Sequence, residues 1–347
     1  MRSVPARRSG RPGDPRAVNT AMPENIDAAV ETLRAGGLVA FPTETVYGLG
    51  ANAADRAAVA KIFALKGRPS DHPVIVHIDD PRRLSRWTRE VPEPARALAA
   101  RFWPGPLTLI LPKSDEVDEV VTGGQDSVGI RVPSHPVAQR LLRAFGGGIA
   151  APSANRYGHL SPTRAAHVRE EFGDAVPIVL DGGESQIGLE STIVACLGDG
   201  VRLLRPGHIT RSQIAAVAGE LVDSGEVPRA PGDRSLHYAP RTPLELVPAA
   251  QLASRLAATA ARGERVGVLA RTPAPPDRPS GVVWLEIAAD ARAYAHDLYD
   301  RLRTLDHAGC ARILVETPPR EESWSAVNDR LRRACGLGGR AIEPGAD

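Results

Sequence analysis

Two arginines in apolar segments are the residues of this sequence that most clearly point to chemistry. Arg131 stands inside the apolar pattern SVGIRVP, and Arg205 ends the apolar run of LLRPG. Because an unpaired buried charge is costly, the guanidinium of Arg131 must meet an anion. For Arg131 that anion is either an internal carboxylate or the carboxylate of a substrate.

A second pair of cations follows a predicted helix. Lys66 and Arg68 lie where the helical pattern of residues 57–67 ends, and Pro69 stops it. They either complement the negative end of the helix or bind phosphates, for which arginine offers a planar fork and lysine a point charge. Lys66 is also one of three lysines in a chain with 43 basic residues.

Small hydroxyl and amide side chains gather in segments 41–50, 151–163 and 188–194. They let a phosphate or ribose approach the backbone, although segment 41–50 could equally be an ordinary polar turn. His77 ends an apolar strand, where a histidine is more often packed in the core than catalytic. The polar residues concerned are Thr43, Glu44, Thr45, Ser153, Asn155, Ser161, Thr163 and Ser191.

Several well-known catalytic motifs are absent from the sequence. It contains no GxxxxGK[ST] loop, no GxSxG elbow, no HExxH and no Cys/His spacing typical of a metal cage. Cations among hydroxyls and amides suit a substrate that carries phosphates. The residues alone therefore predict an anion- or nucleotide-binding α/β protein.

The elements that must position these residues alternate irregularly in the first two thirds of the chain. We expect helices at 25–35, 57–67 and 135–146, and strands at 38–42, 73–78, 104–112, 128–133, 148–153, 176–183 and 191–198. This order lacks strict βαβ alternation, which predicts an α+β or twisted α/β domain on a mixed sheet.

The rest of the chain has a more regular rhythm. Helices are expected at 248–262, 291–308 and 324–335, and strands at 266–270, 282–287 and 312–317, in a mainly parallel, Rossmann-like layering. No GxGxxG is present, so no dinucleotide is assigned. We expect a disordered basic tail at 1–21, a catalytic domain at 22–218, a linker or lid at 219–242 and a C-terminal α/β domain at 243–347, with Met22 as an alternative start.

Composition narrows the class of protein. The 347 residues are 42% hydrophobic and 24% charged, the net charge is +2, and the three cysteines are widely spaced. This balance indicates a cytoplasmic protein without disulfides, membrane spans or a secretory signal, and its charge does not predict bulk nucleic-acid binding.

The polar segments, in their order, resemble the YrdC-like family, and the whole chain resembles its two-domain threonylcarbamoyl-AMP synthases. The matching segments are FPTETVYGLGANA, KGRPSDHPVIVHI, WPGPLTLIL, IRVPSHP, APSAN, SPT, ESTI and LLRPG, with APGDRSLHYAP in the linker. The resemblance implies a twisted mixed sheet with a concave basic cavity. It also implies that L-threonine, bicarbonate and ATP, with Mg²⁺ on the phosphates, form threonylcarbamoyl-AMP and pyrophosphate.

The resemblance also implies roles for individual residues. Lys66 and Arg68 would supply catalytic charge near the phosphates. Threonine would be bound by Thr45, His77, Arg131, Ser153 and Ser191, and ATP by Arg68, His72, Ser127, Asn155, Thr163, Arg205 and Tyr238. His72 departs from the asparagine that is common before this proline. No protein-held metal is implied, and a tRNA threonylcarbamoyl transferase complex would use the product, with at most a weak contact to RNA.

Two other functions fit parts of the pattern. The same concave face could belong to a double-stranded RNA-binding module without catalysis, although the basic residues are not clustered along a helix. The chain could instead be a carbamoyl transferase that uses carbamoyl phosphate, but such relatives carry a zinc module for which this chain lacks the cysteines.

Overall fold

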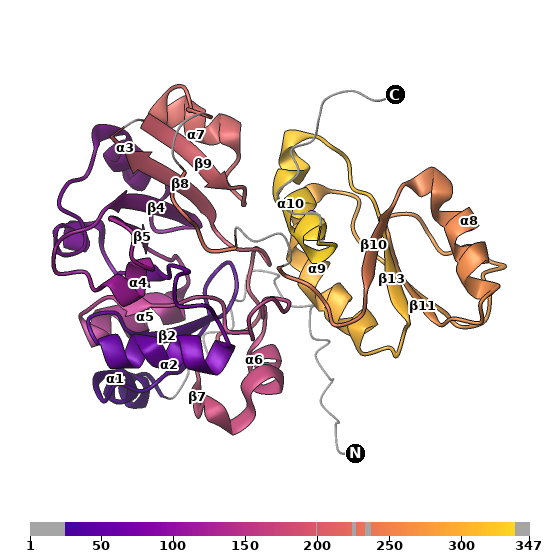
Figure 1. Ribbon diagram of the computed structural model, residues 1–347, viewed down its shortest axis with the longest axis horizontal. Helices are drawn as coiled ribbons and strands as arrows, with labels where there is room; N and C mark the ends of the chain where they lie inside the picture. Colours follow the sequence, from indigo (N-terminus) through magenta and orange to yellow (C-terminus); the bar gives the residue numbers. More distant parts are fainter. Residues whose placement is uncertain (1–24, 199, 224–226, 233–236, 337–347) are drawn as a thin grey trace, which may run out of the picture.

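The computed structural model describes residues 25–198, 200–223, 227–232 and 237–336, which form two α/β units (Figure 1). The predicted tail and part of the linker lie outside the described residues. The helices of the first unit are α1 (Ile26–Arg34), α2 (Arg56–Lys66), α3 (Glu93–Phe102), α4 (Glu119–Thr122), α5 (Pro136–Phe145), α6 (Ala165–Phe172) and α7 (Arg211–Ala218). No helix in these ranges is long and apolar enough to cross a membrane.

The first sheet is mixed, as the irregular order of elements predicted. Its described strands are β1 (Val39–Phe41), β2 (Gly48–Asn52), β3 (Ile75–His77), β4 (Leu107–Pro112), β5 (Ser127–Arg131), β6 (Ile149–Ala150), β7 (Ile178–Val179), β8 (Thr192–Leu197) and β9 (Gly200–Arg205). They are ordered β7-β1-β2-β6-β3-β5-β4-β8-β9, with β3 parallel to β5 and β4 parallel to β8. The strand β2 begins within segment 41–50, for which an ordinary polar turn was one of the two interpretations, and it is an internal strand of this sheet.

The second sheet is parallel in every described pairing. Its strands are β10 (Leu244–Val247), β11 (Val266–Ala270), β12 (Val282–Glu286) and β13 (Arg312–Glu316), in the order β10-β13-β11-β12. Figure 1 shows α8 (Ala249–Ala260) on one side of this sheet, and α9 (Ala291–Asp306) and α10 (Ser325–Ala334) on the side that faces the first unit. The short strand β10 was not predicted.

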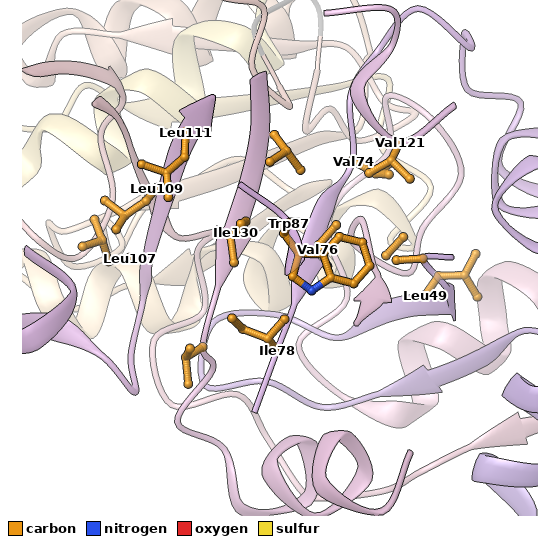
Figure 2. Close-up of a cluster of buried hydrophobic side chains, with 14 of the residues drawn as sticks. Leu49, Val74, Val76, Ile78, Trp87, Leu107, Leu109, Leu111, Val121 and Ile130 are labelled. Carbon is orange, nitrogen blue, oxygen red and sulfur yellow. The ribbon is translucent and has the colours of Figure 1, made fainter. Parts of the chain in front are cut away.

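Strand alternation decides which side chains of the first sheet reach the site. Val76, Ile78 and Ile130 lie in the main apolar core with Leu107, Leu109 and Leu111 (Figure 2). Because successive side chains of a strand point to opposite faces, the neighbouring positions project from the other face. His77 and Arg131 occupy such positions, and they are direct register partners on β3 and β5.

An apolar cluster joins the two units. Val46, Leu160 and Leu189 of the first unit pack with Leu298 and other buried residues of α9. Gly188, which has φ of +80°, lies so close to the backbone of α9 that a methyl group would collide with it at His296. The seam between the units is therefore closely packed.

Candidate functional site

A cavity opens beside the carboxyl ends of β3 and β5 and is closed on one side by the linker residues Pro231, Gly232, His237 and Tyr238. Eight of the thirteen predicted site residues line it, including all five of those predicted for threonine. They are Thr45, Arg68, His77, Arg131, Ser153, Ser191, Arg205 and Tyr238.

Arg131 meets an internal carboxylate, which was one of the two alternatives. Its Nη2 donates to Glu44 Oε1 at 2.7 Å, and its Nη1 donates to Thr45 Oγ1 at 2.9 Å. Glu44 Oε2 also accepts a hydrogen bond from the backbone N–H of Ser134. The guanidinium is therefore paired and held in one orientation beside the hydroxyl of Thr45.

His77 lies next to this pair as a neutral imidazole. Burial and then the charge of Arg131 lower the pKa of His77 from 6.5 to about 3. Its Nδ1 is buried and has no hydrogen-bond partner among the described residues. A ligand that offers a donor or acceptor here would satisfy this nitrogen.

The other end of the cavity is organised by Arg205. Its Nε and Nη2 donate to the carbonyl oxygen of Ser191 at 3.1 and 3.0 Å, and its Nη1 donates to the hydroxyl of Tyr238 at 3.2 Å. The hydroxyl of Ser191 is 2.8 Å from that of Thr108. Tyr238 has φ of 58°, a conformation that is uncommon for a bulky residue and often marks a functional position.

Lys66 lies beneath the cavity and is not among its lining residues. Its Nζ donates to the carbonyl oxygen of Ser153 at 2.5 Å and to that of Asn155. Burial and then the charge of Arg68 hold the pKa of Lys66 well below its usual value. The lysine therefore fixes the loop that carries Ser153.

The remaining predicted residues, His72, Ser127, Asn155 and Thr163, are not among the residues that line the cavity. The hydroxyl of Tyr157 is 3.4 Å from His72 Nδ1, and the ring of Tyr157 also faces the guanidinium of Arg68. Asn155 Nδ2 donates to two carbonyl oxygens of its own loop, at Arg156 and His159. Thr163 lies beside His167, and Ser127 begins β5.

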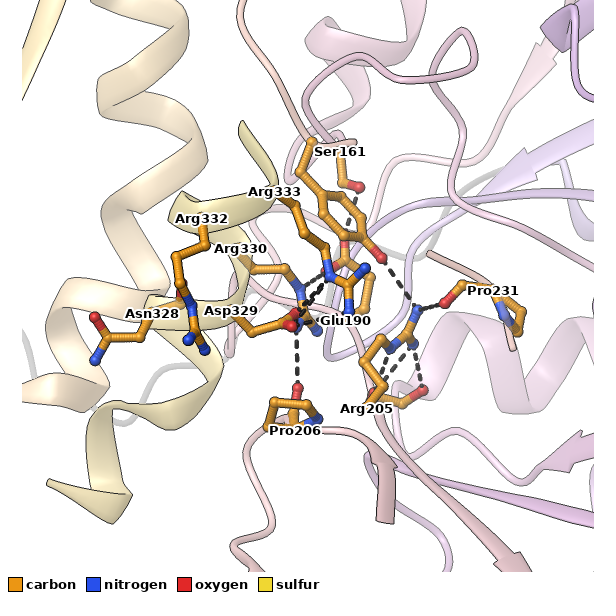
Figure 3. A network of polar contacts seen from close by, with 12 residues as sticks. Ser161, Glu190, Arg205, Pro206, Pro231, Asn328, Asp329, Arg330, Arg332 and Arg333 are labelled. Carbon is orange, nitrogen blue, oxygen red and sulfur yellow. Dashed lines mark hydrogen bonds and ion pairs between the residues drawn. The ribbon is translucent and has the colours of Figure 1, made fainter. Parts of the chain in front are cut away.

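Sequence reasoning missed Glu190, which lines the cavity directly before Ser191. Its buried carboxylate accepts hydrogen bonds from Ser161 and from Arg330 of α10 (Figure 3). It also accepts one from Tyr299 of α9. The available signal was a lone acidic residue in the apolar segment GLESTIV, which requires a buried cation. Nothing in the segment around Glu190 indicates which cation that would be.

Comparison with known families covers both units. Residues 31–207 match a family described as telomere recombination, and residues 209–336 match one described as the C-terminal domain of threonylcarbamoyl-AMP synthase. The chain is 43% identical over 332 residues to the threonylcarbamoyl-AMP synthase of Bacillus subtilis, covering 91% of this chain and 94% of that protein.

Two solved structures of P. abyssi Sua5 share the whole architecture. One, complexed with L-threonine, is 41% identical with a TM-score of 0.82 and covers 90% of this chain and 94% of its own. The other carries alanine in place of a histidine and the tyrosine that directly follows it in the sequence. It is 39% identical with a TM-score of 0.83 and covers 92% of this chain and 95% of its own.

Proposed function

The chain belongs to the family of two-domain threonylcarbamoyl-AMP synthases, and we propose that the cavity between its sheet and its linker binds L-threonine and ATP side by side. The chain is a nucleotidyltransferase that makes threonylcarbamoyl-AMP for the threonylcarbamoyladenosine modification of tRNA. The observation that carries the proposal is the gathering of three arginines with serine and threonine hydroxyls around one cavity.

The reaction needs positioning and charge neutralisation more than acid–base groups. The amine of threonine and bicarbonate give a carbamate with loss of water. A carbamate oxygen then attacks the α-phosphorus of ATP, and the bond to the β-phosphate breaks to release pyrophosphate. A cavity of arginines and hydroxyls suits this step because it holds two anions together and stabilises the charge of the transition state.

The threonine end of the cavity is proposed at Thr45, His77, Arg131, Ser153 and Ser191. Arg131 is the partner proposed for the threonine carboxylate, with its orientation set by the ion pair to Glu44. His77 lines the same cavity as Arg131 and its imidazole is neutral, which supports this assignment. The P. abyssi relative with bound L-threonine also supports a threonine site in this fold.

The nucleotide end is proposed at Arg68, His72, Ser127, Asn155, Thr163, Arg205 and Tyr238, with Lys66 and Arg68 as the catalytic cations. The hydrogen bond from Arg205 to Tyr238 supports the placement of the linker tyrosine over ATP. A P. abyssi variant altered at a neighbouring histidine and tyrosine also draws attention to His237 and Tyr238, the His-Tyr pair of this sequence. The linker, 219–242, is accordingly proposed as a lid.

Mg²⁺ is proposed to enter with the nucleotide. Among the described residues no group of three His, Cys, Asp or Glu side chains could hold an ion, and the carboxylate of Glu190 is paired with Arg330. The residues around the cavity therefore suit an ion that keeps its waters and is bound mainly by substrate phosphates. When bound, Mg²⁺ would neutralise phosphate charge, and the arginines would orient the phosphates.

The finer organisation is proposed as follows. The first sheet is a twisted YrdC-like sheet with a concave basic cavity at 22–218, and 243–347 is a smaller Rossmann-like domain with helices on both faces of its sheet. The protein acts in the cytoplasm and uses bicarbonate. A tRNA threonylcarbamoyl transferase complex takes its product, and any contact with RNA is weak.

Pyrophosphate release tests the proposal directly. The purified chain is incubated with ATP, Mg²⁺, L-threonine and bicarbonate, and each component is then omitted in turn. Pyrophosphate that requires all of the substrates and no RNA is expected. No release under any of these conditions would support an RNA-binding module without catalysis, and release that needs carbamoyl phosphate would support another carbamoyl transferase.

A further inference from the structure

The carboxylate of Glu190 is the meeting point of the two units. Its Oε2 accepts a hydrogen bond from Arg330 Nε at 2.7 Å, and its Oε1 accepts one from Ser161 Oγ at 2.5 Å (Figure 3). The hydroxyl of Tyr299 also donates to Oε2, at 3.1 Å. Two of these three donors come from the C-terminal domain. That domain therefore contacts a residue that lines the cavity.

The same two C-terminal residues also hold the linker tyrosine. The ring of Tyr299 is stacked on that of Tyr238, with centroids 6.2 Å apart, and the guanidinium of Arg330 lies 5.1 Å from the centre of the Tyr238 ring. Arg330 is 1% exposed, and its Nη1 also donates to the carbonyl oxygen of Pro206. The uncommon backbone conformation of Tyr238 is thus supported from the C-terminal side.

These contacts connect Arg205 and Tyr238, which are proposed to bind ATP, with Ser191, which is proposed to bind threonine. Glu190 is followed by Ser191, whose carbonyl oxygen and hydroxyl both bond Arg205. Arg205 in turn bonds the hydroxyl of Tyr238, which Arg330 and Tyr299 cover. A shift of the C-terminal helices would therefore move residues of both proposed binding sites.

The negative charge of Glu190 also matters for the binding of anionic substrates. Burial raises the pKa of Glu190, but the charges of Arg330 and Arg205 outweigh it and hold the pKa below its usual value. The residue is an anion at the wall of a cavity whose ligands are anions. Without Arg330, its charge would repel the phosphates of ATP.

We propose that Arg330 and Tyr299 are positioning residues, by which the C-terminal domain completes the nucleotide site: Arg330 neutralises Glu190, and both residues hold Tyr238 and Ser191 in place. The inference rests on the proposed roles of Tyr238 and Ser191. The C-terminal domain then acts on the reaction through these residues, without an assigned substrate contact of its own.

The test is made in the full chain. It first removes the positive charge of Arg330 alone and then removes the negative charge of Glu190 as well. Arg330→Met should raise the KM for ATP about tenfold or more in the pyrophosphate assay, because it leaves a buried carboxylate unpaired. Adding Glu190→Gln to Arg330→Met should recover most of the affinity for ATP, since it removes the repelling charge. Tyr299→Phe, which keeps the ring and loses the hydroxyl, should raise the same KM by a smaller factor.

Arg332→Met is the matched control. It removes a cation from the same helix, but Arg332 bonds the carbonyl oxygen of Asn328 and points away from Glu190 (Figure 3). The KM for ATP should not change. The melting temperature of each variant shows whether it is folded at the assay temperature.

Either of two results would overturn the inference. One is a folded Arg330→Met protein with an unchanged KM for ATP, and the other is a folded double variant that binds ATP no better than Arg330→Met. Tyr238→Phe and Ser191→Ala test the underlying assignments separately. If neither alters the KM of ATP or threonine, the proposed site is wrong whatever Arg330 does.

Discussion

The carboxylate of Glu44 lies 2.7 Å from the guanidinium of Arg131, and both side chains are buried. The pair explains how a charged residue can occupy an internal strand of the first sheet. It also means that Arg131 supports the fold as well as the proposed threonine site, so its substitution should have two separable effects.

Arg131→Ala should raise the KM for threonine strongly and the KM for ATP less. It should also lower the free energy of unfolding by about 3–5 kcal/mol, because Glu44 is left buried without its partner. Arg131→Lys should restore little of the threonine KM or of the stability, since an ammonium cannot reproduce the forked contacts to Glu44 and Thr45. Steady-state pyrophosphate release and urea denaturation measure the two effects.

The double variant Glu44→Gln with Arg131→Ala separates these effects. It should recover stability, because no charge is left unpaired, but it should not recover the KM for threonine. A folded Arg131→Ala protein with an unchanged KM for threonine would contradict the assignment of Arg131 to the substrate.

Tyr238→Ala should raise the KM for ATP, because the ring that closes the cavity beside Arg205 is lost. Tyr238→Phe should have a smaller effect, since it keeps the contacts with Tyr299 and Arg330.

Truncation after about residue 218 should leave a first domain that binds ATP weakly and makes little product. Isothermal titration with ATP and the pyrophosphate assay would measure both. A truncated domain with full activity and an unchanged KM for ATP would mean that the linker is only a tether.

Stability should fall in mild acid because His77 is buried in its neutral form. Its pKa is about 3 in the folded protein and 6.5 as an ordinary value, so below pH 6.5 the unfolded chain binds the additional proton. Stability is therefore fully present above pH 6.5 and is lost, by up to about 1.4 kcal/mol per pH unit, as the pH falls toward 3. His77→Gln should flatten this dependence in urea denaturation. An unaltered slope in the His77 variant would show that this histidine is not the group responsible.

Lys66→Met should lower both stability and activity, because two buried carbonyl oxygens of the loop 153–155 lose their donor. The expected loss of stability is about 1–3 kcal/mol. Lys66→Arg should not restore either property, since a guanidinium is larger than the ammonium in a fully buried place. Melting temperatures and kcat would be measured together. A fall in kcat at unchanged stability would support the proposed catalytic charge of Lys66, whereas a parallel loss of both would indicate that its main role is to hold the loop.

Local patterns in the sequence predicted much of the fold. Apolar alternation placed strands over β3, β4 and β5, and helical spacing with a following glycine placed α2 and α5 within one residue at either end. The strand β2 was missed because two of its five residues are glycines, which are depleted in strands and resemble a turn. Pairing with β1 and β6, rather than local propensity, makes it a strand.

The partners of the charged residues could be predicted only in part. Arg131 was expected to meet an anion, but nothing local distinguishes Glu44 from a substrate carboxylate. Glu190 and Arg330 are 140 residues apart, and their pairing depends on how two units pack. Single-residue patterns describe faces and burial, and they carry no information about such long-range contacts.

The apolar cluster at the seam couples the folding of the two units. Val46 and Leu189 of the first unit, Tyr238 of the linker and Leu298 of α9 belong to one core. Separating the units would expose this core to water, so much of the free energy of docking is hydrophobic. Heating should therefore produce one calorimetric transition for the whole chain, because neither unit can melt without removing part of the other's interior.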